Sequence, residues 1–215
     1  MSDVRAEWDE RYREAHGGHH GSLWVSHPHA ELRAIVTGLP PAGAAPRRAL
    51  DIATGDGRNA IWLARHGWQT TAVDFSAQAL AIAREHAEEA GVAPEFVCAS
   101  ILDWATDDRF DLVTVTYLHL GDEPIRALLQ RIAGWLAPGG TVVMIGHDVD
   151  NVAAGGHGPA DPAVLWTPAL LRDAALGAGL VVERCESLLR DAAADPEKPD
   201  EEGASVDTLL VARRP

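Results

Sequence analysis

The chain has 215 residues, of which 47% are hydrophobic and 23% are charged, with 18 lysines and arginines against 32 aspartates and glutamates. A chain of this length and composition is typical of a one-domain globular enzyme that buries roughly 70% of its unfolded surface. The formal net charge of −14 argues against nucleic acid as a partner, because an acidic surface repels phosphate backbones.

Two further features bear on location. No basic stretch precedes an apolar signal segment, and no apolar run reaches membrane-spanning length, so we expect neither a targeting segment nor a membrane partner. The two cysteines, Cys98 and Cys185, lie in strand-like stretches, where we expect buried thiols of a reducing compartment. The predicted location is the cytoplasm.

The first 45 residues are predicted to form a helical extension that acts as a lid. A polar helix is expected around "EWDERYREA" (7–15), followed by a Gly/His-rich loop and a short helix over "HAELRAIVTGL" (29–39). Residues 46–215 are predicted to form the core. The whole chain, 1–215, is therefore expected to be a single domain.

Short apolar strands then alternate with helical patterns. Ser76, Asp122 and Thr167 stand where helix N-caps are expected, and Gly91 and "APGG" (137–140) where helices should end. The five strands are predicted from the apolar stretches at 49–52, "QTTAVD" (69–74), "EFVCAS" (95–100), "FDLVTVTYL" (110–118) and "TVVMIGH" (141–147).

The C-terminal part changes character. "LVVERCESLLR" (180–190) and "VDTLLVARR" (206–214) are strand-like, and the acidic segment between them contains no helical pattern. Two strands without a crossover helix should pair antiparallel. The predicted fold is thus an α/β sheet of about seven strands in three layers. It should have helices on both faces and be parallel except for a C-terminal antiparallel strand at one edge.

The stretch "LDIATGDGRNAIWLARHG" (50–67) has a strand, a glycine turn and a helix, the arrangement that binds nucleotides. Asp51 and Asp56 would repel a dinucleotide pyrophosphate, by about 4 kcal/mol per pair of charges 4 Å apart at an effective dielectric of 20. S-adenosylmethionine has no phosphate and carries a sulfonium and an ammonium, so the acids would attract it. Asp74 ends the second strand, where an acid bridges ribose hydroxyls.

Four motifs in order, "LDIATGDGRNAIWLA", "AVDFS", "FDLV" and "LAPGG", resemble the Rossmann-like S-adenosylmethionine-dependent methyltransferases over roughly residues 5–213. "GRNAIWLA" with "LWVSHP" upstream is similar to the small-molecule branch around tellurite-resistance and thiopurine-type S-methyltransferases. The sequence departs from the pattern at Ala53, where a glycine is usual, and at Ser100, where an aspartate is common.

The resemblance implies a set of cofactor-binding residues, with S-adenosylhomocysteine (SAH) as the product. Its members are Asp51, Ala53, Gly55 and Gly57 at the methionine part, Asp74 at the ribose, Phe75, Ser100 and Ile101 around the adenine, Thr116 near the sulfonium, and Trp24 over the methionine moiety.

Two histidines follow predicted strands at the ends where ligands bind in open α/β sheets, His119 in "TYLHL" and His147 in "IGHDVD". Each is a candidate catalytic base, His147 with Asp148 as its orienting partner, and each could equally be a local structural residue. Methylation of a thiolate needs no strong base, whereas an oxygen or nitrogen nucleophile benefits from one.

The predicted function is methyl transfer from S-adenosylmethionine to a small-molecule acceptor by in-line displacement. The acceptor could be a thiol, a metalloid oxyanion or a small oxygen or nitrogen nucleophile. One alternative is an NAD(P)-dependent reductase of Rossmann type. Another is a non-catalytic protein that binds metal or metalloid through "HGGHHGSLWVSHPH" (16–29). That loop lacks cysteines and a fixed ligand spacing, so no metal ligands are predicted, and the sequence carries no prediction of oligomeric state.

Overall fold

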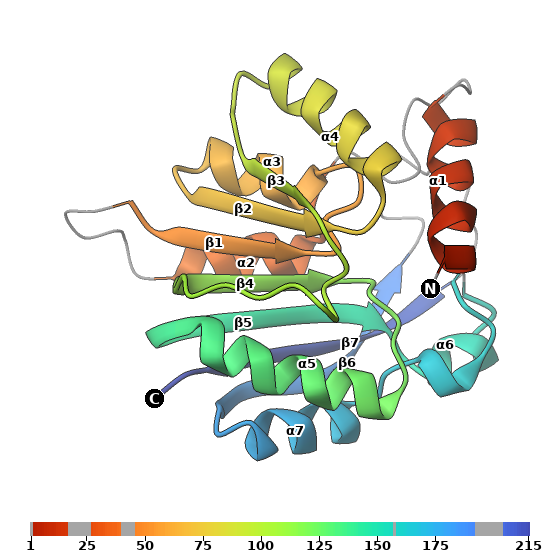
Figure 1. The fold of residues 1–215 in the computed structure, drawn as a ribbon. Helices are drawn as coiled ribbons and strands as arrows, with labels where there is room; N and C mark the ends of the chain where they lie inside the picture. Colours follow the sequence, from red (N-terminus) through yellow and green to blue (C-terminus); the bar gives the residue numbers. More distant parts are fainter. Residues whose placement is uncertain (1, 17–26, 40–45, 157, 192–203) are drawn as a thin grey trace. The chain divides into compact units, whose positions relative to one another are not determined.

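The computed structural model describes residues 2–16, 27–39, 46–156, 158–191 and 204–215 (Figure 1). The chain divides into two compact units, residues 1–106 and residues 107–215, and each unit is described by itself. In the described ranges no helix has the length and apolar character needed to cross a membrane. The single-domain arrangement with a lid at residues 1–45 stays a prediction.

The first unit contains a parallel three-stranded arrangement in the order β3-β2-β1. The register pairs Asp51 with Ala72 and Asp74 with Cys98, so the carboxyl ends of β1 and β2 lie at one edge. The elements are α1 (Ser2–His16), α2 (Ala30–Gly38), β1 (Arg48–Ile52), α3 (Arg58–Arg65), β2 (Gln69–Asp74), α4 (Ala77–Glu89) and β3 (Glu95–Cys98).

Apolar periodicity and capping explain these elements. The strands β1 and β2 are buried along almost their whole length, as expected for parallel strands covered by helices. The Ser76 hydroxyl accepts a hydrogen bond from the Ala79 amide at 3.0 Å, which confirms Ser76 as the N-cap of α4. The helix α1 lies beside α4, and its Trp8 and Tyr12 pack against Ala79 and Ile82 (Figure 1).

The second unit contains four strands in the order β4-β5-β7-β6. β4 and β5 are parallel, and β7 is antiparallel to both β5 and β6. The predicted C-terminal hairpin is confirmed, but β7 lies inside β6 rather than at the edge. The elements are β4 (Phe110–Thr116), α5 (Asp122–Trp135), β5 (Leu136–His147), α6 (Asp150–Ala153), the 3₁₀ helix η1 (Pro162–Val164), α7 (Pro168–Gly177), β6 (Val181–Asp191) and β7 (Ala204–Arg213).

Three local predictions were wrong. Gly121, not Asp122, caps α5, and Asp122 stands in the first turn, where its charge favours the helix dipole. The "APGG" segment belongs to β5, which already begins at Leu136. Cys98 is exposed and Cys185 is half-buried, and each lies on a strand at one end of the strand order, β3 and β6.

Candidate functional site

The glycine turn of the first unit reverses the chain between β1 and α3 through three left-handed residues. Ala53 has φ 55°, Gly55 has φ 58° and Gly57 has φ 87°. A Cβ on Gly57 would lie 2.9 Å from the Cβ of Ala83, so this glycine allows the start of α3 to approach α4 closely. Ala53 adopts the same region without being glycine, which indicates strain at the turn.

Asp74 is clamped between the glycine turn and the start of α4. Its Oδ2 accepts the Gly55 amide at 2.9 Å, and its Oδ1 accepts the Ser76 amide at 2.9 Å. Burial raises the pKa of Asp74, the amides of Ser76, Gly55 and Phe75 oppose the shift, and Asp9 adds to it. Each carboxylate oxygen retains a further lone pair, so the clamped group can still accept ribose hydroxyls.

Two more acids are buried near this turn. Asp51 is 0% exposed and its Oδ2 accepts the Thr54 hydroxyl at 2.6 Å, so Thr54 fixes the carboxylate against the turn. Asp56 is 3% exposed, so it is not a solvated turn residue. Three buried acids in one turn and its neighbouring strand end suit a cationic nucleoside and disfavour a pyrophosphate.

The remaining predicted cofactor residues fall into three groups. Phe75 and Ser100 are half-buried and Ile101 is buried, and all three follow the carboxyl ends of β2 and β3 in the first unit. Thr116 is the last residue of β4 in the second unit and is buried. Trp24 lies outside the described residues.

In the second unit, His147 forms a dyad with an aspartate that the sequence did not single out. Its Nδ1 lies 3.0 Å from Oδ1 of Asp207, which is its antiparallel partner on β7 and is 0% exposed. An ionised carboxylate only accepts hydrogen bonds, so in the neutral form of the imidazole Nδ1 carries the proton and Nε2 has a lone pair. This is the arrangement of an imidazole held ready to accept a proton.

Asp207 is the centre of a wider network. Its Oδ2 accepts the Tyr117 hydroxyl at 3.2 Å and Nε of Arg190 at 3.2 Å. The Tyr117 ring lies 4.9 Å from the His147 ring, and Tyr117 has a left-handed backbone with φ 55°. A Cβ on Gly158 would come 2.4 Å from Cδ2 of His147, so the backbone of Gly158 packs directly against the imidazole.

His119 stacks on His147, with the ring centroids 5.2 Å apart and the planes 5° from parallel. Its ring nitrogens are buried and make no hydrogen bond of normal geometry with the described residues. The pKa of His119 is lowered from 6.5 to about 4, mainly by burial and in part by the nearby His147, while Asp207 and a weak contact with the Val164 backbone oppose the shift. His119 is therefore neutral at pH 7 and a weaker proton acceptor than an ordinary histidine.

The predicted pairing of His147 with Asp148 is wrong. Oδ2 of Asp148 accepts the hydroxyls of Ser187 and Thr208, both at 2.7 Å, and its Oδ1 accepts the Asp150 amide at 3.0 Å. Adjacent side chains at a strand end point to opposite sides, which separates this carboxylate from the imidazole. The orienting acid comes instead from β7, and the predicted antiparallel pairing was the only sequence signal for it.

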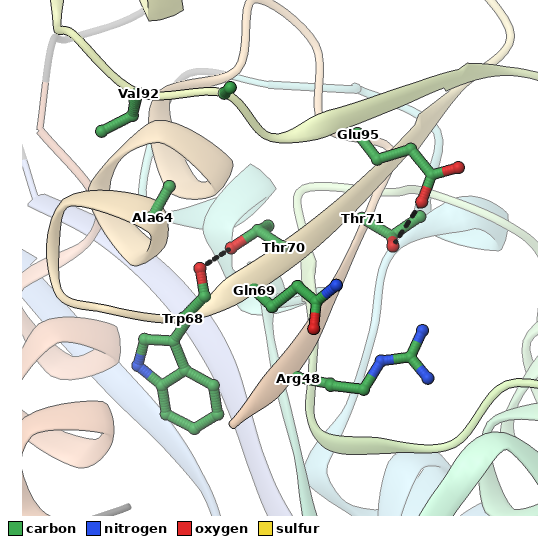
Figure 2. A pocket seen from close by; sticks show the side chains of 9 residues that line it. Arg48, Ala64, Trp68, Gln69, Thr70, Thr71, Val92 and Glu95 are labelled. Carbon is green, nitrogen blue, oxygen red and sulfur yellow. Dashed lines mark hydrogen bonds between the residues drawn. The ribbon is translucent and has the colours of Figure 1, made fainter. Parts of the chain in front are cut away.

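Two other features of the described residues bear on possible ligand sites. Among the described residues no group of three or more His, Cys, Asp or Glu side chains could hold a metal ion, while His19 and His20 lie outside these residues. A hollow of about 290 Å³ lies at the amino ends of β1, β2 and β3, where Thr71 donates a hydrogen bond to Glu95 at 3.2 Å (Figure 2). None of the predicted site residues lines it.

Part of the chain matches a known family. Residues 49–140 match the family model described as a methyltransferase domain. A ubiquinone biosynthesis O-methyltransferase of Xanthomonas axonopodis pv. citri is 33% identical over 117 residues, which are 53% of this chain and 47% of that protein. The chain thus spans about half the length of the curated relatives it matches.

Solved structures extend the fold to the whole chain. A structure associated with the conversion of a disulfide bond into a thioacetal group during echinomycin biosynthesis has a TM-score of 0.76 and 23% identity, covering 98% of this chain and 91% of that one. The magnesium protoporphyrin IX methyltransferase ChlM from Synechocystis PCC 6803, with bound SAH, has a TM-score of 0.69 and 15% identity. The match covers 100% of this chain and 99% of that one. These likenesses confirm the Rossmann-like fold.

The matches confirm the resemblance to S-adenosylmethionine-dependent methyltransferases. They favour this hypothesis over the alternative of a Rossmann-type reductase. The residues present fit the cofactor of this family. The glycine turn leaves a buried, hydrogen-bonded acid at the end of β2 and two further buried acids beside it, as a cationic nucleoside requires.

Proposed function

We propose that the protein transfers the methyl group of S-adenosylmethionine to a hydroxyl oxygen of a small aromatic acceptor. The observation that favours an oxygen or nitrogen nucleophile over a thiolate is the His147–Asp207 dyad, with Nδ1 and Oδ1 3.0 Å apart, which leaves Nε2 as a proton acceptor. The choice of oxygen over nitrogen rests on the name of the Xanthomonas relative. A hydroxyl loses its proton as it attacks the methyl carbon, so a positioned base accelerates the reaction by about 10²–10⁴-fold. A thiolate acceptor would need no such dyad.

The two units contribute different groups. In the first, Asp74 would accept the ribose hydroxyls, and Asp51, Ala53, Gly55 and Gly57 would surround the methionine part, with Phe75, Ser100 and Ile101 around the adenine. In the second, His147 would take the acceptor's proton, and Thr116 stays a predicted cofactor residue. The cofactor supplies an already electrophilic methyl group, so the protein has only to align the reactants and exclude water.

Support for an oxygen acceptor also comes from the relatives, since the Xanthomonas protein is named an O-methyltransferase of ubiquinone biosynthesis. A hydroxyl oxygen is the acceptor that this name favours, and the dyad is compatible with it. A cytoplasmic location stays a prediction, and so does the exclusion of nucleic acid partners, which rests on the acidic composition. The role of Trp24 as a cover over the methionine moiety also remains a prediction.

The test is a methyl-transfer screen in which SAH release is measured with small phenols, amines, thiols and oxyanions of selenium and tellurium. We expect transfer to a phenol, and we expect His147→Gln to lower its turnover about 10²–10⁴-fold without changing SAH affinity. His66→Gln is the matched control, because His66 is an exposed histidine of the first unit. Efficient transfer only to thiols, at equal rates in the His147→Gln and wild-type proteins, would overturn the oxygen acceptor and the base together.

A further inference from the structure

The helix α1 is tied to the residue that holds Asp74 in place. Oδ1 of Asp9 accepts the Ser76 hydroxyl at 2.5 Å, although these residues are 67 positions apart in the chain. The same Ser76 donates its amide to Oδ1 of Asp74 at 2.9 Å. One residue thus connects a carboxylate of the N-terminal helix with the carboxylate at the end of β2.

The hydroxyl and the backbone amide of Ser76 are both engaged in hydrogen bonds, so one contact cannot change without affecting the others. Its hydroxyl has one proton, which it donates to Asp9, while its oxygen accepts the Ala79 amide at 3.0 Å. The side chain is completely buried, so water does not compete for these bonds. Loss of the bond to Asp9 leaves a buried hydroxyl proton without its acceptor, which favours reorientation of the whole turn.

The packing of α1 places Asp9 where it is needed. Tyr12 is buried and Trp8 is partly buried against Ala79 and Ile82 of α4, which fixes the height and rotation of α1 on that helix. Asp9 lies between these two aromatic residues in the sequence and also accepts the Gln78 amide, at 3.3 Å. The apolar contacts therefore hold the helix, and Asp9 supplies its polar link to the first turn of α4.

We infer that Asp9 is a positioning residue for the cofactor, which acts through Ser76 to hold Asp74 in its ribose-binding orientation. This inference rests on the proposed function, since it assigns Asp74 to the cofactor. It also implies a reciprocal effect. If docking of α1 strengthens cofactor binding by some factor, bound cofactor must stabilise the docked α1 by the same factor.

The alternative is a purely structural role, in which Asp9 only caps the first turn of α4. The two roles differ in what they couple. A cap contributes to stability whether or not cofactor is bound, whereas a positioning residue changes the response of α1 to the cofactor. Loss of stability alone therefore does not support the inference, and a change in coupling does.

The experiment measures SAH affinity by calorimetry and amide hydrogen exchange of residues 4–16, in the wild-type protein and in Asp9→Ala. We expect Asp9→Ala to weaken SAH binding about tenfold, the loss typical of one charge-assisted hydrogen bond. We also expect SAH to slow exchange in α1 of the wild-type protein by a similar factor and to have no such effect in Asp9→Ala. Glu10→Ala is the matched control, because Glu10 is an exposed acid that pairs with Arg13 of the same helix.

Asp9→Asn provides a second, milder variant that keeps an oxygen acceptor for Ser76 and loses only the charge. It should weaken binding by about threefold, and it carries the test if Asp9→Ala does not fold. Unchanged SAH affinity in the Asp9 variants, or equal exchange of α1 with and without SAH in the wild-type protein, would overturn the inference. Failure of the wild-type protein to bind SAH would instead overturn the proposed function on which it rests.

Discussion

The turn after β1 and the turn after β4 begin alike and are stabilised differently. Each follows a buried strand with a non-glycine residue in the left-handed region, Ala53 and Tyr117, both at φ 55°. In the first unit, backbone amides hold the carboxylate of Asp74, which we propose for the ribose. In the second, the side chains of Tyr117, His147 and Arg190 hold Asp207. Backbone contacts survive changes of side chain, so the first site is generic, and the second can be specific to one acceptor.

The largest effect is expected where the side-chain network is broken. Asp207→Asn replaces an acceptor with an amide that can also donate, which allows His147 to adopt the tautomer with its proton on Nε2. We expect turnover to fall about 10²–10⁴-fold with unchanged SAH affinity. Rates are to be measured per folded molecule, because the substitution also weakens the contact with Arg190.

Asp148→Asn is the control for this variant, since Asp148 is a buried acid that contacts Ser187 and Thr208 and not the imidazole. Its turnover per folded molecule should stay near the wild-type value although its stability falls. Equal losses of turnover in both variants would show that the dyad has no special role and that any buried acid of this unit matters equally.

The next largest effect concerns the backbone-held carboxylate. Asp74→Ala should weaken SAH binding by roughly 2–3 kcal/mol, because ribose hydroxyls lose a charged acceptor and the amides of Gly55 and Ser76 lose theirs. Calorimetry measures the affinity, and Asp103→Ala, at an exposed acid of the same unit, serves as control. Unchanged affinity in Asp74→Ala would remove this residue from the cofactor site.

The difference between backbone and side-chain contacts also decided which residues could be predicted from the sequence. Asp74, Gly55 and Gly57 could be predicted as cofactor residues because they stand in short, ordered motifs, and their role stays a prediction. Asp207 was missed because His147 and Asp207 are 60 positions apart and meet only through the antiparallel pairing of β5 with β7. The sequence predicted that pairing without its register, and a shift of one residue would have turned Asp207 to the other face of the sheet.

A third effect follows from the buried His119. Its pKa of about 4 lies below the ordinary 6.5 of the unfolded chain, so the unfolded state binds the proton more readily between these values. Stability from this residue is therefore present above pH 6.5 and is lost as the pH falls towards 4. The loss between pH 7 and pH 4.5 is about 2 kcal/mol, by the linkage of one titrating group.

His119→Gln removes this titration and keeps a polar side chain. Chemical denaturation at pH 7 and pH 4.5 should show that the variant loses less stability on acidification than the wild-type protein, by about 2 kcal/mol. His86→Gln, at a half-buried histidine of the first unit, corrects for general effects of histidine removal. The same acid sensitivity in His119→Gln and wild type would contradict the burial-driven shift.

The smallest effect tests the strain shared by the two turns. A left-handed conformation costs a non-glycine residue about 1–2 kcal/mol, and glycine avoids it at an entropic cost of about 0.5–1 kcal/mol. Ala53→Gly should therefore raise the free energy of unfolding by about 0.5–1 kcal/mol. The matched control is Ala81→Gly, which deletes the same methyl group at an exposed position inside α4 and should lower stability by about the same amount. Opposite signs in thermal unfolding would confirm that the strain lies in the backbone of Ala53. If both variants lose stability, the backbone of Ala53 is not strained. The turn after β1 then shares its φ value with the turn at Tyr117 but stores no conformational energy.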